Sequence, residues 1–77
     1  MKIENGVLLS INDNDIKDGL LKLPENVKEI ANAVIREKDD LEKVIALGLE
    51  RIGDDNFRYC NALVSFEAPV LTQIGNY

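Results

Sequence analysis

Apolar and small residues recur along this 77-residue chain with a period of 22 residues. Isoleucine occupies positions Ile30, Ile52 and Ile74, and a glycine follows at Gly53 and Gly75. The other columns with this step are Val27/Leu49/Leu71, Leu41/Leu63, Val44/Phe66 and Ala46/Ala68. A fixed period in this range is the signature of stacked repeats, in which each unit buries its apolar face against the next. The pattern therefore predicts a solenoid.

Two segments in which apolar and polar residues alternate, 41–46 and 63–68, predict short strands. In the first segment, we expect the inward side chains to be Leu41, Val44 and Ala46, and the outward ones to be Lys43 and Ile45. Residues 47–53 and 69–75 then turn the corner of each unit and carry an isoleucine back into the interior. Strands of successive units would stack as a parallel sheet.

The segment 53–62 ("GDDNFRYCNA") returns the chain from one unit to the next. Gly53 permits a tight bend, and Phe57 and Cys60 are three residues apart, which suits one turn of helix. The predicted fold class is therefore α/β: a solenoid of short parallel strands with helical or turn-like return segments. Its period of 22 residues lies in the range of leucine-rich repeats.

The period also divides the chain into one cap and three units of a single domain, 1–77. The cap is expected at residues 1–18, and the units at 19–40, 41–62 and 63–77, the last of them incomplete. For the cap we expect a β-hairpin in which "NGVLLSI" is a strand, "NDND" is a polar turn and "GLLKL" is the returning strand. Such a hairpin would cover the open side of the first unit.

The quoted segments resemble a known family. The stretches "LKLPENVKEIA", "LERIGDDNFRYCNALVSFEAP" and "LTQIGNY" are similar to bacterial leucine-rich repeats of the BspA-like type. Units of this family alternate a Leu-x-x-Val-x-Ile-Pro strand with an Ile-Gly-x-x-Ala-Phe-x-x-Cys return segment. The resemblance covers residues 19–77, about two and a half repeats, and implies an N-terminal fragment of a protein-binding or scaffold module.

The second unit matches the family spacing best. It holds Ile52, Gly53, Phe57 and Cys60 in place, with Asn56 where alanine is usual. The first unit departs further from the pattern. It has Ala31 for the glycine, Ile35 for the phenylalanine and Lys38 for the cysteine.

A helical interpretation is the alternative. Twenty-two residues are also about six turns of α-helix, so the same columns would share one helix face. Pro24 suits a first helical position and Gly53 a C-cap. Against a helix, the segment 64–75 is rich in β-branched residues and is interrupted by Pro69. A small helical regulatory protein, such as an antitoxin, is the function that would accompany this alternative.

Composition and charge narrow the classes of partner. Fourteen acidic residues against nine basic ones give a net charge of −5, which repels nucleic-acid phosphates and anionic lipids. No apolar run approaches the roughly 18 residues of a membrane helix. The N-terminus "MKIENGVLLS" lacks the features of a signal peptide, and a single cysteine cannot form an internal disulfide, which together favour the cytoplasm. No nucleic-acid or membrane partner is expected.

The stretch "INDNDIKDG" was compared with a calcium loop, whose ligand spacing is fixed by one bound ion. Starting the loop at Asp13 puts Asp18 where a glycine is needed and Pro24 at the position of the last ligand. A polar turn is the better interpretation. Cys60 has no histidine anywhere in the chain to act as its base, so a small buried hydrophobe is expected there. No metal, cofactor or enzymatic activity is predicted.

Two surfaces remain as candidates for function. The outward strand face, which repeat proteins often use for binding, would present Lys22, Lys43, Ile45, Ser65 and Glu67 to a protein partner. The incomplete last unit would expose Phe66, Leu71, Ile74 and Tyr77. The alternative function is therefore a structural capping fragment of a longer repeat protein, which self-associates through this end into a homo-oligomer. Elsewhere, the 22-residue step places Glu29 beside Arg51, a pair that would stabilise the stacking register.

Overall fold

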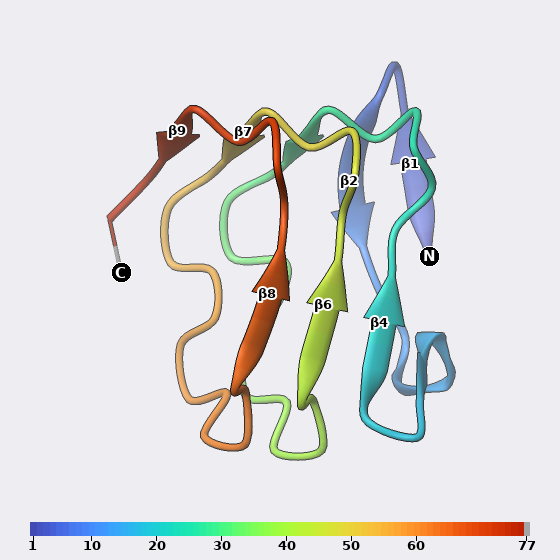
Figure 1. Cartoon of the computed structure of the whole chain (residues 1–77), viewed down its shortest axis with the longest axis vertical. Coiled ribbons are helices and arrows are strands. Elements are labelled where there is room, and N and C mark those ends of the chain that lie inside the picture. The colour runs from blue at the N-terminus through green and yellow to red at the C-terminus, as the bar shows by residue number, and fades with distance from the viewer. Residues whose placement is uncertain (77) are drawn as a thin grey trace.

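Two sheets wind around one apolar core in the computed structural model, which describes residues 1–76 (Figure 1). The first sheet has the strand order β1 (Lys2–Glu4), β2 (Val7–Ser10), β5 (Glu29–Ile30), β7 (Arg51–Ile52) and β9 (Gln73–Ile74). The second has the order β3 (Ile16–Lys17), β4 (Leu20–Lys22), β6 (Lys43–Ile45) and β8 (Ser65–Glu67). Each coil contributes one strand to each sheet, which is the arrangement of a β-solenoid.

The strand register confirms the repeat. In the first sheet, each of the parallel steps from β2 to β5, β7 and β9 pairs residues 22 positions apart, as in the row Leu8, Ile30, Ile52, Ile74. In the second sheet, the step from β6 to β8 is also 22 residues, but the step from β4 to β6 pairs Leu21 with Val44 and is one residue longer. The extra residue lies between β4 and β5, where Pro24 begins the corner.

The core matches the inward columns of the pattern. The predicted inward side chains Leu41, Val44 and Ala46 are all buried. The remaining buried apolar residues are Leu8, Ile16, Leu21, Leu23, Val27, Ile30, Ile35, Leu49, Ile52 and Cys60. Both sheets supply some of these side chains, and the corner and return segments supply the others, so the core fills the interior of the coils. Burial of apolar area along this interior is the main stabilising contribution to the fold.

The N-terminal cap differs from the prediction. The prediction of a hairpin between residues 5–11 and 19–23 was wrong, because β2 and β4 belong to different sheets. The structure has two hairpins instead: β1 with β2 around Asn5-Gly6, and β3 with β4 around Asp18-Gly19. All four turn residues have positive φ, between 51° and 80°, which is the conformation that Asn-Gly and Asp-Gly favour in two-residue hairpin turns. Each sheet therefore begins with an antiparallel hairpin.

The polar stretch "NDND" is a turn, as expected, but it joins the two hairpins rather than closing one. Residues Asp13–Asp15 form a 3-10 turn (η1). The carboxylate of Asp15 accepts the backbone N–H of Asn12 at 2.8 Å and lies 3.0 Å from the amino group of Met1. Asp13 pairs with Lys38 at 2.9 Å. Within the cap, Asp15 connects the 3-10 turn to the amino terminus, and Asp13 connects the turn to Lys38 of the first coil.

The return segments contain no helix, so the α/β class and the helical turn around Phe57 and Cys60 were wrong. Residues Asp55, Phe57 and Tyr59 have φ between 58° and 65°, and a left-handed residue at every second position cannot belong to a right-handed helix. Successive returns instead pair through an isolated parallel bridge between Arg36 and Arg58. Within residues 1–76 the only helix is the 3-10 turn, so the helical alternative was also wrong.

Asn56 links two successive return segments from the interior. Its side chain is 1% exposed, and its Oδ1 accepts the N–H groups of Val34 (3.0 Å) and Ile35 (2.9 Å). Its Nδ2 donates to the carbonyl oxygens of Ala31 (2.9 Å) and Gly53 (3.1 Å). Both hydrogens of the amide and both lone pairs of its oxygen are thereby used. One side chain thus satisfies four backbone groups in a stretch where strands provide almost no backbone hydrogen bonds.

A second polar column stacks on the same side. The Oδ1 of Asn32 accepts the N–H of Asp54 at 2.7 Å, and the Oδ1 of Asp54 accepts the N–H of Asn76 at 2.9 Å. A side chain on Gly53 would collide with Asn32 and with the backbone beneath it, and Gly75 is in the same position above Asp54. This contact explains why glycine recurs immediately before the aspartate or asparagine of each later coil.

Candidate functional site

The outward face of β3, β4, β6 and β8 brings together all five predicted partner-binding residues. Strand pairing arranges the face in two rows. The first row, from β3 to β8, is Lys17, Leu20, Lys43 and Ser65, and the second, from β4 to β8, is Lys22, Ile45 and Glu67. Their chain neighbours Leu21 and Val44 point into the core. We call these seven side chains the strand face.

The strand face has a charge opposite to that of the whole protein. Lys17, Lys22 and Lys43 lie on three consecutive strands, with Glu67 as the one acidic residue of the set. Within residues 1–76, none of these lysines forms an ion pair. Since the whole chain carries a net charge of −5, this face is a local cationic area on an acidic protein. It would attract a carboxylate-rich segment and repel a cationic one.

The first sheet lacks this character. Its outward row from β2 to β9 is Val7, Glu29, Arg51 and Gln73. The predicted pair is present, with the Arg51 Nε 2.9 Å from Glu29 Oε1, and Arg51 also approaches Glu50 at 3.6 Å. Because these charges neutralise one another within the sheet, the row has little left to offer a charged partner.

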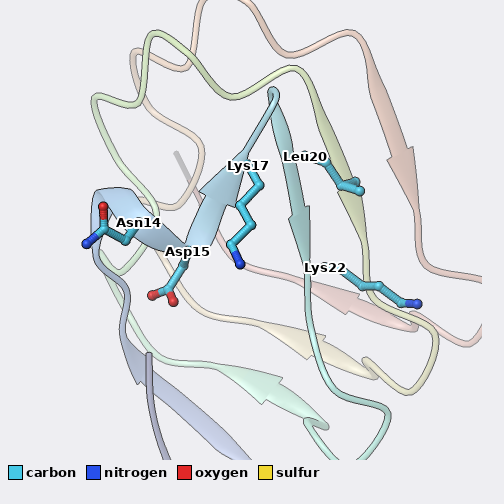
Figure 2. Close-up of a pocket in the computed structure, with 5 residues that line it drawn as sticks. All are labelled: Asn14, Asp15, Lys17, Leu20 and Lys22. Atoms are coloured by element: carbon cyan, nitrogen blue, oxygen red, sulfur yellow. The ribbon is translucent and has the colours of Figure 1, made fainter.

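One end of the strand face is hollowed. The hollow has a volume of about 320 Å³ and is lined by Asn14, Asp15, Lys17, Leu20 and Lys22. Figure 2 shows that the first two residues come from the 3-10 turn and the others from β3 and β4. Leu20 provides an apolar wall between two lysine side chains. This combination can hold an apolar side chain and a neighbouring carboxylate at the same time.

The hollow also contains Asp15, a carboxyl whose pKa is displaced. The backbone hydrogen bond from Asn12 lowers the pKa of Asp15 below its usual 3.8, and the amino terminus lowers it further. Asp15 is therefore ionised at neutral pH and is occupied in holding the cap together. These two contacts give Asp15 a structural role in the hollow.

Sequence reasoning missed Lys17 and Leu20. A strict 22-residue step aligns Leu20 with Glu42, whereas the longer first step places it beside Lys43. Lys17 was assigned to the cap, although β3 extends the sheet by one strand. The inward positions of both Leu21 and Leu23, which alternate with Lys22, were the available signal that Leu20 points outward.

The second candidate surface lies at the C-terminal end of the solenoid. Phe66, Leu71 and Ile74 line a second hollow of about 320 Å³ together with Ile52 and Phe57. The rings of Phe57 and Phe66 are in edge contact, with centroids 5.2 Å apart. Ile74 is 62% exposed and Phe66 is 36% exposed. Tyr77, the fourth predicted residue of this surface, lies outside the described residues.

The remaining candidates have structural roles. Cys60 is buried, as predicted, and its Sγ lies 3.8 Å from the carbonyl oxygen of Arg58. In the same return segment, Asp54 accepts the backbone N–H of Asn76 and Asp55 pairs with Arg58 at 3.6 Å. Among residues 1–76, no three metal-binding side chains come together. In the same part of the chain, no helix has the length and apolar character needed to cross a membrane.

Comparisons with protein-family models, with curated proteins and with solved structures find no match to this chain. The two surfaces described above are therefore the basis on which a function can be proposed.

Proposed function

We propose that this protein is a non-enzymatic binding module of leucine-rich-repeat type, and that its strand face binds an extended, acidic segment of a partner protein. The observation that supports this best is the arrangement of Lys17, Lys22 and Lys43 around Leu20 and Ile45. Apolar side chains at the centre supply binding energy, while the charges around them select the partner and its orientation.

The spacing of the face suits an extended ligand. Neighbouring strands are about 4.8 Å apart, and alternate side chains of an extended segment are about 6.8 Å apart. Lysine has a flexible four-carbon stem, so its ammonium group can shift by the few ångströms that separate the strand spacing from the side-chain spacing of the ligand. An acidic residue at every second position could therefore meet one lysine after another, with the intervening or flanking apolar side chains against Leu20 and Ile45.

Assignment to the BspA-like type is part of the same proposal. It is supported by Ile52, Gly53 and Cys60, which match the family spacing and lie where their residue types are needed. Ile52 and Cys60 are buried, and Gly53 leaves room for Asn32 of the preceding coil. The return segments, which are built of turns and contain no helix, are consistent with the turn-like variant of the repeat.

Selection from a library of displayed, unstructured peptides tests this function. We expect the selected peptides to be enriched in Asp and Glu alternating with Leu, Val or Ile, and their binding to weaken as salt is raised. The double variant Lys43→Glu/Ile45→Asp should lose at least about tenfold in affinity with a nearly unchanged melting temperature, because both side chains point outward.

A matched control is available on the other sheet. Lys2→Glu/Leu9→Asp makes the same chemical changes at exposed positions of β1 and β2. This variant should bind the selected peptides like the natural chain. Equal binding by the strand-face variant, or equal losses in both variants, would contradict the proposal.

A further inference from the structure

The hollow beside the 3-10 turn lies at one end of the strand face. In the second sheet β3 is the edge strand, and the turn leads directly into it. Asn14 and Asp15 of the turn line the hollow together with side chains of β3 and β4 (Figure 2). A ligand that lies across the strands from β8 towards β3 therefore reaches the turn after the last strand. The hollow suits the end of a bound segment better than its middle.

Strand pairing places one apolar side chain beside two cations in the hollow. Leu20 is paired with Lys17 across β3 and β4, and Lys22 is two residues further along β4, so the three side chains leave the sheet on the same face. Leu20 is half-buried, whereas both lysines are exposed. Within residues 1–76 neither lysine forms an ion pair. A group that fits here has an apolar side chain and a carboxylate close together.

The charge of the lining distinguishes the two ends of a polypeptide. Two lysines against one aspartate leave the lining with a net charge of +1. The carboxylate of Asp15 already accepts the N–H of Asn12 at 2.8 Å and lies 3.0 Å from the amino group of Met1. An α-carboxylate would neutralise the net charge, whereas an α-ammonium group would be repelled by both lysines. The hollow therefore favours the C-terminus of a ligand over its N-terminus.

The hollow has the dimensions of a site for one terminal residue. Its volume of about 320 Å³ is at the lower end of the range for ligand pockets, about 300 to 1,000 Å³. A terminal residue carries its side chain and its α-carboxylate on the same Cα atom, which matches the direct pairing of Leu20 with Lys17. An internal acidic residue is a poorer match, because the next apolar side chain on the same side of an extended segment is about 6.8 Å away.

We infer that the hollow holds the C-terminal residue of the partner protein, with an apolar side chain against Leu20 and the α-carboxylate between the ammonium groups of Lys17 and Lys22. The inference rests on the proposed function and fixes the direction of the bound segment. Two residues before the C-terminus, the next side chain on the same face reaches β6, where Lys43 is paired with Leu20. The ligand is therefore a protein C-terminus with an apolar last residue and an acidic residue two positions earlier.

Fluorescence anisotropy with synthetic peptides tests this inference. The reference probe is Ser-Glu-Val-Asp-Ser-Leu, labelled at its N-terminus and with a free α-carboxylate. The second probe is its C-terminal amide, and the third is extended beyond the leucine by Gly-Ser-Gly, which keeps the net charge but moves the α-carboxylate out of the hollow. We expect the second and third probes to bind at least about tenfold more weakly than the first, because each loses the charge-assisted hydrogen bonds to lysine.

Substitutions in the chain assign each carboxylate to its lysine. Lys17→Gln and Lys22→Gln should each reduce the preference for the free acid over the amide to less than about threefold. Lys43→Gln is the matched control: it should weaken both probes alike, and it should remove the preference for Asp over Asn two positions before the C-terminus. Lys17→Arg should retain the preference for the free acid, because the cation is kept. All three lysines are exposed, so circular dichroism should not change.

The outcomes separate this inference from the proposed function. Equal binding of the acid and the amide, full binding of the extended probe, or a preference for the free acid that survives both Lys17→Gln and Lys22→Gln would overturn the inference alone. Binding of library peptides but of none of these probes would do the same. If neither the library peptides nor the probes bind, the function and the inference are both overturned. The three probes are compared on the natural chain, so the test does not depend on the folding of any variant.

Discussion

Replacing Asn56 by alanine tests how the return segments are held together. The substitution introduces the residue usual at this position in the repeat family that the sequence resembles, so family resemblance alone predicts a mild effect. The structure predicts a large one. Four hydrogen bonds are lost, to Val34, Ile35, Ala31 and Gly53, and the alanine side chain replaces none of them.

The expected loss in the free energy of unfolding follows from the backbone groups that stay buried without a hydrogen-bond partner. The N–H groups of Val34 and Ile35 lose their acceptor, and a buried polar group without a partner costs about 1 to 3 kcal/mol. Water entering the vacated space would rehydrate some of the four groups, so we expect a net loss of about 3 kcal/mol. A chain of 77 residues has a total stability of about 4 to 12 kcal/mol. Asn56→Ala should therefore remove a large fraction of the stability.

Urea denaturation followed by circular dichroism measures this loss. Asn61→Ala, which removes an exposed amide from the same return segment, is the matched control and should change the free energy of unfolding by less than about 0.5 kcal/mol. A loss below about 1 kcal/mol for Asn56→Ala would refute the four-bond description of this side chain.

The variant Asn56→Asp tests the same hydrogen bonds through the pH dependence of its stability. An ionised carboxylate could still accept from Val34 and Ile35, but it would face the carbonyl oxygens of Ala31 and Gly53 in a buried site. Its folded-state pKa would therefore be raised above the unfolded value. The deficit relative to the natural chain should be largest at neutral pH and shrink as the pH falls through the raised pKa.

Two further predictions concern the cap and the coil stacking. Asp15→Asn should lower stability by less than about 1 kcal/mol at pH 7. Because the folded-state pKa of Asp15 is depressed, its contribution is present above 3.8 and is lost as the pH falls below that value, so thermal melts of the two proteins should converge in acid. Gly53→Ala should destabilise by about 1 to 3 kcal/mol, because the added methyl group meets Asn32 and the backbone of Ala31. Gly6→Ala is not a matched control, because φ at Gly6 is +77° and a side chain there would be strained in itself. The control is Ala33→Gly, at an exposed position with left-handed φ, which should leave the free energy of unfolding unchanged or raise it.

The sequence was sufficient to predict the repeat and its interior. The 22-residue columns of Ile30, Val44 and Ala46 report burial directly, because stacked coils must place apolar residues at equivalent positions. The parallel strands of the first sheet were not visible in the same way. Strands β5, β7 and β9 have two residues each, too few to show an alternation.

The predictions of a helical return segment and of a single cap hairpin were wrong for different physical reasons. Phe57 and Tyr59 adopt left-handed backbone conformations that are rare for such residues, and only contacts between coils can impose them. In the cap, by contrast, Asn5-Gly6 and Asp18-Gly19 were standard hairpin signals that could have been used. The role of Asn56 could not be foreseen, because its four partners lie 3 to 25 positions away.

The positions of the candidate binding residues on the sheet were predicted more completely than the fold around them. Lys22, Lys43, Ile45, Ser65 and Glu67 all lie on one sheet face, since the alternation of a strand fixes which side chains leave the core. The missing members, Lys17 and Leu20, depend on a hairpin strand and on one inserted residue near Pro24. Neither feature belongs to the period from which the face was predicted.

The central claim, that the strand face binds an extended acidic segment, is tested most directly by amide NMR spectra of the chain during titration with a selected acidic peptide. The predicted result is saturable shift changes confined to β3, β4 and β6, largest around Lys17, Leu20 and Ile45. Saturable changes on β5 and β7 instead, or none on the strand face at saturating peptide, would contradict it.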